Sequence, residues 1–162
     1  GRSGKEELAR KLYKEIRATD GVISAIDMML HDYGPDRYSG SVNIEIDHKR
    51  SIGEVYEEIH RLQLRIMEEY HVTMVFGIYA VDEDTAAIVD IRRYIGKFVR
   101  VNEHVKSFHA LYLSEETGTL YCDLIVDYAL RDWEELRESF VEYMKKQYPE
   151  YEILLTIETE FV

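Results

Sequence analysis

The sequence predicts an α+β protein made of two tandem units, each with the element order α-β-β-α-β. Two observations predict it. Segments with helical spacing of apolar residues are interspersed with segments that alternate apolar and polar residues as strands do. The order of these segments then repeats after about half of the 162 residues. We place the first unit over residues 1–83 and the second over residues 84–162.

The first unit shows these elements in turn. Residues 5–17 have apolar side chains at helical spacing, and the Asp-Gly pair after them ends the helix. Strand-like runs follow over 22–33 and 38–47, with a Gly-Pro-Asp turn between them. A longer helix over 51–70 and a strand over 72–81 complete the unit.

The second unit repeats this order. A helix over 85–101 precedes strands over 104–113 and 119–128, which a tight turn ending in glycine connects. A helix over 132–148 and a strand over 151–161 follow. Overlaying the units requires offsets of 83, 80 and 79 residues, and it aligns three pairs of positions: Asp27 with Ala110, Asp47 with Asp127, and Tyr79 with Glu158.

Two helices carry start signals. Ser51 followed by Glu54 is a capping box, and Asp132 is a further N-cap residue. We expect the helix after Ser51 to turn one apolar side inward, formed by Ile52, Val55, Ile59, Leu62 and Ile66. A unit of this kind folds as a three-stranded sheet with helices on one face, a ferredoxin-like arrangement that leaves the other face of the sheet open.

Composition excludes several functions. The net charge of −12 argues against nucleic acid as a partner, because phosphate backbones require a basic surface. A single cysteine, Cys122, excludes an internal disulfide framework. No apolar run approaches the length of about 20 residues that spans a bilayer. No nucleophile motif or phosphate-binding glycine loop is present, so we expect no enzyme activity.

Potential metal ligands gather on the second unit. Strand alternation places His109 on one side with Ser107 and Leu111, and Asp123 on one side with Tyr121 and Ile125. If the open face of the sheet carries them, the candidate metal ligands are His109, Asp123, Glu158 and Glu160. Such nitrogen and oxygen donors suit Zn²⁺, Mn²⁺ or Fe²⁺. The same residues are equally compatible with acids on a solvated sheet face.

The matching positions of the first unit are poorer in ligands. They are Ile26, Asn43, Tyr79 and Val81, of which only Asn43 carries a donor of the kind that metals bind. We therefore expect an apolar packing surface there, and any metal site in the second unit.

Motifs in a fixed order resemble a known family. The first unit contains Asp20-Gly21-Val22, then Asp27 through Pro35, then Gly40 through Asp47, and Ile78-Tyr79. This pattern resembles the C-terminal cytoplasmic domain of cation diffusion facilitator (cation efflux) proteins. The second unit resembles the extra C-terminal copy that some bacterial members carry, and its matching residues are His109, Asp123 through Asp127, Tyr148-Pro149 and Ile157 through Phe161.

The resemblance implies a function. Members of this family are homodimeric metal/proton antiporters that export divalent cations, and their cytoplasmic domains have a metallochaperone-like fold. Those domains form dimers, and some bind metal at the dimer interface. The resemblance implies a homodimer attached to the cell inner membrane through N-terminal transmembrane helices that this chain lacks. This chain would lie on the cytoplasmic side as a regulatory and dimerisation domain.

The resemblance also assigns ligand positions. The family's first-strand histidine falls on Ile26 and on His109 in the two units, and its second-strand histidine falls on Asn43 and Asp123. Its last-strand histidine and aspartate fall on Tyr79 and Val81 in the first unit, and on Glu158 and Glu160 in the second. An alternative function is a stand-alone module that binds a small molecule in a sheet groove, although its strand-helix junctions would be expected to contain glycine.

Overall fold

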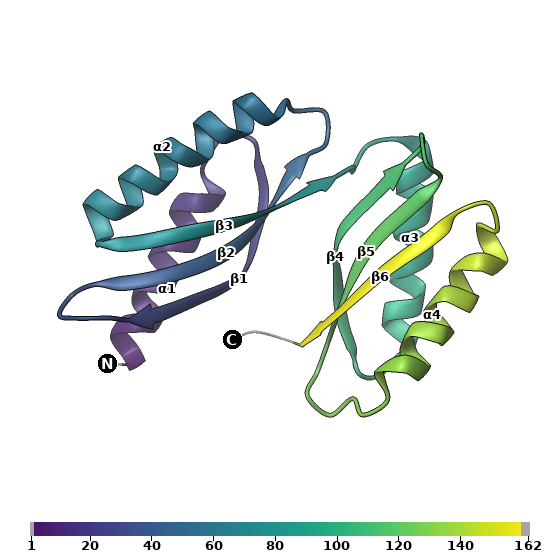
Figure 1. The fold of residues 1–162 in the computed structure, drawn as a ribbon. Helices are drawn as coiled ribbons and strands as arrows, with labels where there is room; N and C mark the ends of the chain where they lie inside the picture. The colour runs from purple at the N-terminus through teal and green to yellow at the C-terminus, as the bar shows by residue number, and fades with distance from the viewer. Residues whose placement is uncertain (1, 160–162) are drawn as a thin grey trace. The chain divides into compact units, whose positions relative to one another are not determined.

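The computed structural model describes residues 2–159, and within this range the helices and strands follow the order α-β-β-α-β twice (Figure 1). The chain divides into two compact units, one ending at Tyr79 and the next beginning at Ala80. Each unit has a three-stranded sheet of its own. The predicted α+β class and the repeated element order are confirmed.

The first unit contains five elements around one core. They are α1 (Arg2–Arg17), β1 (Val22–Asp32), β2 (Tyr38–Asp47), α2 (Ile52–Tyr70) and β3 (Val72–Val81). The sheet has the order β1-β2-β3, so β2 is central, and β1 runs antiparallel to it. The two helices and the inner face of the sheet enclose an apolar core that includes Leu12, Ile16, Ile44, Leu62 and Ile66.

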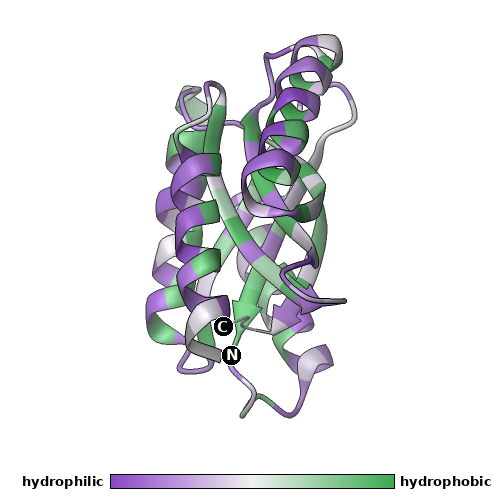
Figure 2. Ribbon diagram, turned by 90° about the vertical axis from the view of Figure 1, so that its left-hand side faces the viewer, coloured by the Kyte–Doolittle hydropathy of each residue, from purple (hydrophilic) through white to green (hydrophobic). Residues whose placement is uncertain are grey.

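The second unit has the same plan. Its elements are α3 (Ala86–Val101), β4 (Val105–Ser114), β5 (Thr119–Val126), α4 (Trp133–Gln147) and β6 (Glu152–Thr159). Central β5 pairs antiparallel with β4 and parallel with β6, and both helices lie on one side of this sheet (Figure 1). In Figure 2, hydrophilic and hydrophobic residues alternate along the helices in view. Both helices of the second unit bury residues at helical spacing, Ile88, Ile91, Ile95 and Phe98 on α3 and Leu136, Phe140 and Met144 on α4. Their apolar sides supply the core together with Leu111, Leu120, Leu124 and Ile157.

Helix starts follow the predicted capping residues. The Ser51 hydroxyl accepts the amide of Glu54 at 3.2 Å, and the Asp132 carboxylate accepts the amide of Glu135 at 3.0 Å. The prediction for Ile52 is wrong: this side chain is 90% exposed. Ile52 is the first residue of α2, one turn before Val55, which is the first buried residue of the helix. It keeps the helical spacing of the buried residues, so its exposure comes from its place at the helix end.

Strand register confirms the duplication in detail. The β1–β2 pairing shifts between Ile26 and Met29, and the β4–β5 pairing shifts between His109 and Tyr112, 83 residues later. Within these bulges Asp27 and Ala110, the residues that the overlay aligned, both have positive φ, 57° and 55°. Non-glycine residues rarely adopt this conformation, so the two units share a specific irregularity as well as an element order.

Side chains from the helices bind the outer edges of both sheets. Arg17 donates to the carbonyl of Ala25 on β1 at 2.8 Å, and Gln63 donates to that of Met74 on β3 at 2.8 Å. Arg137 donates to the carbonyl of Leu155 on β6. Each of these strands is an outer strand of its sheet, so the helices reach the strands that have a neighbour on one side only.

Candidate functional site

His109 and Asp123 lie directly opposite each other in the β4–β5 pair. Opposed residues of an antiparallel pair hold their Cβ atoms about 4.5–5.5 Å apart, which brings an imidazole and a carboxylate together on one face. The hydroxyl of Ser107, two residues earlier on β4, lies 3.3 Å from the Nε2 atom of His109. The predicted neighbourhood of His109, Ser107 and Asp123 is therefore formed.

The bulge in β4 changes one predicted neighbour. Strict alternation placed Leu111 on the same side as His109, but Leu111 is fully buried in the core beneath the sheet. The extra residue at Ala110, with its positive φ, shifts the alternation by one position after His109. The prediction for Leu111 is thus wrong, because period-two reasoning does not anticipate a bulge.

Asp123 is not a solvated surface acid. The side chains that β5 turns toward the helices, Leu120, Cys122, Leu124 and Val126, belong to the core. Asp123 points to the opposite face, yet it is only 8% exposed, and Ile125 beside it is buried as well. Burial of a carboxylate is costly unless it is compensated. This burial disfavours the alternative in which Asp123 is one of several acids on a sheet face that water covers.

The other two candidate ligands, Glu158 and Glu160, are not direct cross-strand neighbours of His109 or Asp123 in the described residues. On β6, Thr156 is opposite Asp123, and Glu158 is opposite Ile125, two pairs further along. Glu158 is therefore a diagonal neighbour of Asp123, about 6.6 Å along the strands and about 4.8 Å across them. Glu160 lies outside the described residues. Within residues 2–159 no group of three or more His, Cys, Asp or Glu side chains could hold a metal ion.

The equivalent place in the first unit holds a different polar set. Ile26 is opposite Asn43, as His109 is opposite Asp123. The Asn43 amide donates to Asp27 at 3.4 Å. A Cβ on Gly77 would lie 2.3 Å from the Asn43 side-chain oxygen, so this amide fills space that the glycine leaves. The sequence reasoning missed the role of Asp27, which the bulge turns toward Asn43.

A second polar group in the second unit was also missed. The Nδ1 atom of His104 lies 3.0 Å from one carboxylate oxygen of Asp127 and 3.3 Å from the other. Burial raises the pKa of the Asp127 carboxyl, but the His104 hydrogen bond, the Ala129 amide and the charge of Lys106 outweigh it and lower that pKa. Asp47 is the counterpart of Asp127 in the first unit. Each aspartate accepts the backbone amide two residues later, from Lys49 and from Ala129. The overlay of the two aspartates was the sequence signal for this shared turn.

No protein-family model matches the sequence, and no curated protein matches it. Among solved structures, the chain is similar to variants of the MamM CTD. A nickel form is 13% identical, with a TM-score of 0.43 over 48% of this chain and 99% of that chain. A zinc form is 15% identical, with a TM-score of 0.44 over 52% and 93%.

A further MamM CTD variant, with two substitutions, is 13% identical and has a TM-score of 0.45 over 50% of this chain and 99% of that chain. Each match covers about half of this chain, which is the length of one unit. At these values the likeness assigns neither an activity nor a ligand to this chain. Of the helices within residues 2–159, none combines the length and apolar character needed to cross a membrane.

Proposed function

We propose that this chain is the cytoplasmic regulatory and dimerisation domain of a divalent-cation efflux transporter, a metal/proton antiporter of the cation diffusion facilitator type. One observation carries the proposal. Two of the four positions of the second unit to which the sequence resemblance assigned ligands, His109 and Asp123, are direct cross-strand neighbours. In the full-length protein, N-terminal transmembrane helices would hold this domain at the cytoplasmic side of the cell inner membrane.

The second unit is the proposed metal sensor. An imidazole and a carboxylate side by side provide two donors that Zn²⁺, Mn²⁺ and Fe²⁺ accept, whereas the matching pair in the first unit, Ile26 and Asn43, provides one weak donor. Two ligands from one chain do not complete a coordination sphere. The same pair from a second copy would raise the number to four, and Glu158 and Glu160 are the further candidates.

Metal and dimer are then linked. An ion held by side chains of two copies binds the dimer and not the separated chains, so it shifts the equilibrium toward the dimer. The ion also neutralises carboxylates that otherwise repel one another across the contact, which matters in a chain with a net charge of −12. In this proposal the domain is non-catalytic, and nucleic acid is not a partner.

Calorimetry tests the metal site directly. We expect Zn²⁺ or Mn²⁺ to bind the 162-residue chain, and His109→Ala and Asp123→Asn each to weaken binding at least tenfold. The asparagine keeps the shape of a buried side chain and removes its charge. His60→Ala is the matched control, because His60 is exposed on α2 and stacks only on Tyr56.

Sedimentation of the same proteins gives the second readout. Metal should strengthen self-association of the unsubstituted chain, and a chelator should reverse the effect. Binding that survives both substitutions would remove the site from His109 and Asp123. Absence of any binding heat would leave the domain without a sensing role.

A further inference from the structure

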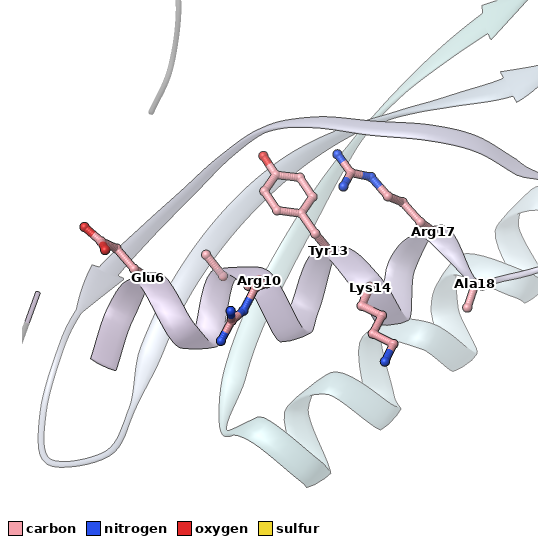
Figure 3. A pocket seen from close by; sticks show the side chains of 7 residues that line it. Glu6, Arg10, Tyr13, Lys14, Arg17 and Ala18 are labelled. Carbon is pink, nitrogen blue, oxygen red and sulfur yellow. The ribbon is translucent and has the colours of Figure 1, made fainter. Parts of the chain in front are cut away.

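A basic stripe runs along α1 in an otherwise acidic chain. Its residues are spaced four, four and three positions apart, which places them on one side of the helix, outside the core-facing Leu12 and Ile16. They line a surface groove of about 700 Å³ together with Ala9, Tyr13 and Ala18 (Figure 3). The charged members of this α1 stripe are Glu6, Arg10, Lys14 and Arg17.

The α1 stripe is partly pre-organised. The Arg17 guanidinium lies over the ring of Tyr13, 4.5 Å from its centre, and donates to the Ala25 carbonyl. In Figure 3, Arg10 and Lys14 extend below α1, whereas Tyr13 and Arg17 extend above it. Among the described residues, Lys14 makes no ion pair. A cation without a counter-ion, in a chain with a net charge of −12, suits an anionic partner.

The outer side of α4 carries the opposite pattern. Exposed charged residues cover the side of α4 away from the buried Phe140 and Met144, and four of them have the spacing of a stripe, with Glu134 and Lys145 beside it. Neither Glu138 nor Glu142 has an ion-pair partner within residues 4–159. Followed from the carboxyl end of α4 toward its start, the members of this α4 stripe are Lys146, Glu142, Glu138 and Glu135.

The two stripes match residue by residue when the helices run antiparallel. Both have the spacing four, four, three, and both extend over 12 residues, whose ends lie about 16 Å apart along the helix. The α1 stripe has one negative charge followed by three positive ones, and the reversed α4 stripe has one positive charge followed by three negative ones. The matched pairs are Glu6–Lys146, Arg10–Glu142, Lys14–Glu138 and Arg17–Glu135.

We propose that α1 of one copy of this chain docks antiparallel against α4 of a second copy. The inference rests on the dimerisation part of the proposed function and names the surface that carries it. A long polyanion would meet repulsion from the rest of the chain, whereas α4 presents three carboxylates at the spacing of the α1 cations. The contact requires no metal.

Exposed ion pairs are weak and screened by salt, so the association is weak and salt-dependent. In sedimentation experiments with a chelator at 50 mM NaCl, we expect a dimer that weakens at least tenfold at 500 mM NaCl. Lys14→Glu and Glu138→Lys should each weaken the dimer at least tenfold. Lys97→Glu, an equal charge reversal at an exposed lysine of α3, should change it less than twofold.

Charge exchange separates contact between copies from contact within one chain. The double variant Lys14→Glu/Glu138→Lys should recover the dimer. A mixture of the two single variants should also recover it, because a mixed pair presents opposite charges at both contacts. Circular dichroism confirms that each variant is folded.

Each other outcome overturns the inference. A dimer that Lys14→Glu leaves intact rejects this surface while dimerisation itself stands. If the double variant recovers the dimer and the mixture of single variants does not, then Lys14 and Glu138 pair within one chain and not between copies. If the unsubstituted chain stays monomeric both with and without metal, the surface and the proposed dimerisation fall together.

Discussion

Tyr94 and Tyr143 exchange two hydrogen bonds, because each phenolic hydroxyl donates to the backbone carbonyl of the other residue at 2.6 Å. Their rings stack with centres 4.0 Å apart. Tyr94 belongs to α3 and Tyr143 to α4, so the reciprocal pair fixes the two helices of the second unit against each other. Both hydroxyls are satisfied without any side-chain acceptor.

Removing either hydroxyl should destabilise the second unit. We expect Tyr143→Phe and Tyr94→Phe each to lower the free energy of unfolding by about 1 kcal/mol, the usual net value of one hydrogen bond. Urea titration followed by circular dichroism measures the change. Tyr33→Phe is the control, because Tyr33 is 59% exposed. Equal unfolding midpoints for Tyr143→Phe and Tyr33→Phe would show that the reciprocal bonds contribute nothing.

Tyr13 supports the bulge of the first unit. Its hydroxyl accepts the backbone amide of Met28 at 2.8 Å, and Met28 is only 6% exposed. Tyr13→Phe leaves this buried amide without its acceptor, so we expect a loss of about 1–3 kcal/mol in unfolding free energy. Hydrogen exchange should show faster exchange of the Met28 amide. Tyr56→Phe, at a 63% exposed position, should leave that amide protected.

Two glycines should respond to alanine with opposite signs. A Cβ on Gly40 would lie 2.8 Å from the Leu30 side chain and 2.9 Å from the Met29 carbonyl oxygen, and the backbone atom cannot easily move. We expect Gly40→Ala to cost about 1–3 kcal/mol through overpacking. Gly53, in α2, has no atom within 4 Å of a new Cβ.

Gly53→Ala should stabilise the protein by about 0.5–1 kcal/mol, because alanine restricts the unfolded chain and favours helix. Thermal unfolding of both variants and of the unsubstituted chain shows whether each substitution raises or lowers the unfolding temperature. A loss of stability on both substitutions would contradict the packing described around Gly53.

Acid should weaken the contribution of Asp127. Its carboxyl has a pKa that is lowered in the folded state, so the group stabilises the fold above the unfolded-state pKa of about 3.9. That stability is lost as the pH falls through the lowered folded-state pKa. Asp127→Asn should therefore lower the urea midpoint at pH 7, and the difference should shrink as the pH falls through the lowered folded-state pKa.

Urea titrations at pH 7, 5 and 3 measure this difference, and Asp20→Asn, at an exposed position, is the matched control. A difference that stays constant with pH would mean that Asp127 acts through shape and not through charge.

Pattern reasoning predicted the parts of this structure that depend on local periodicity. The duplication and the caps at Ser51 and Asp132 follow from side-chain spacing and hydrogen-bonding chemistry close to each residue. The grouping of His109 with Ser107 on one side of a strand also follows, because it requires only strand alternation before the bulge. These features involve residues that are neighbours in sequence or in one strand pair.

Features that depend on departures from periodicity were not predicted. The bulge at Ala110 sends Leu111 into the core, and no residue there carries the usual glycine signal of a left-handed conformation. The bond from Met28 to Tyr13 joins residues 15 positions apart and requires the packing of α1 on β1. The closeness of Glu158 to Asp123 depends on the β5–β6 register, which spans a whole helix.

The bonds from Arg17, Gln63 and Arg137 to outer-strand carbonyls have a consequence for biosynthesis. Two homologous sheets in one chain invite strand exchange, since a segment of the later copy could add to the earlier sheet while both are forming. Arg17 and Gln63 each occupy a carbonyl on one outer strand of the earlier sheet, so fewer of its edge groups remain to pair with the strands that leave the ribosome after it. A gene duplication could then produce two units that fold separately, without exchange of strands between them.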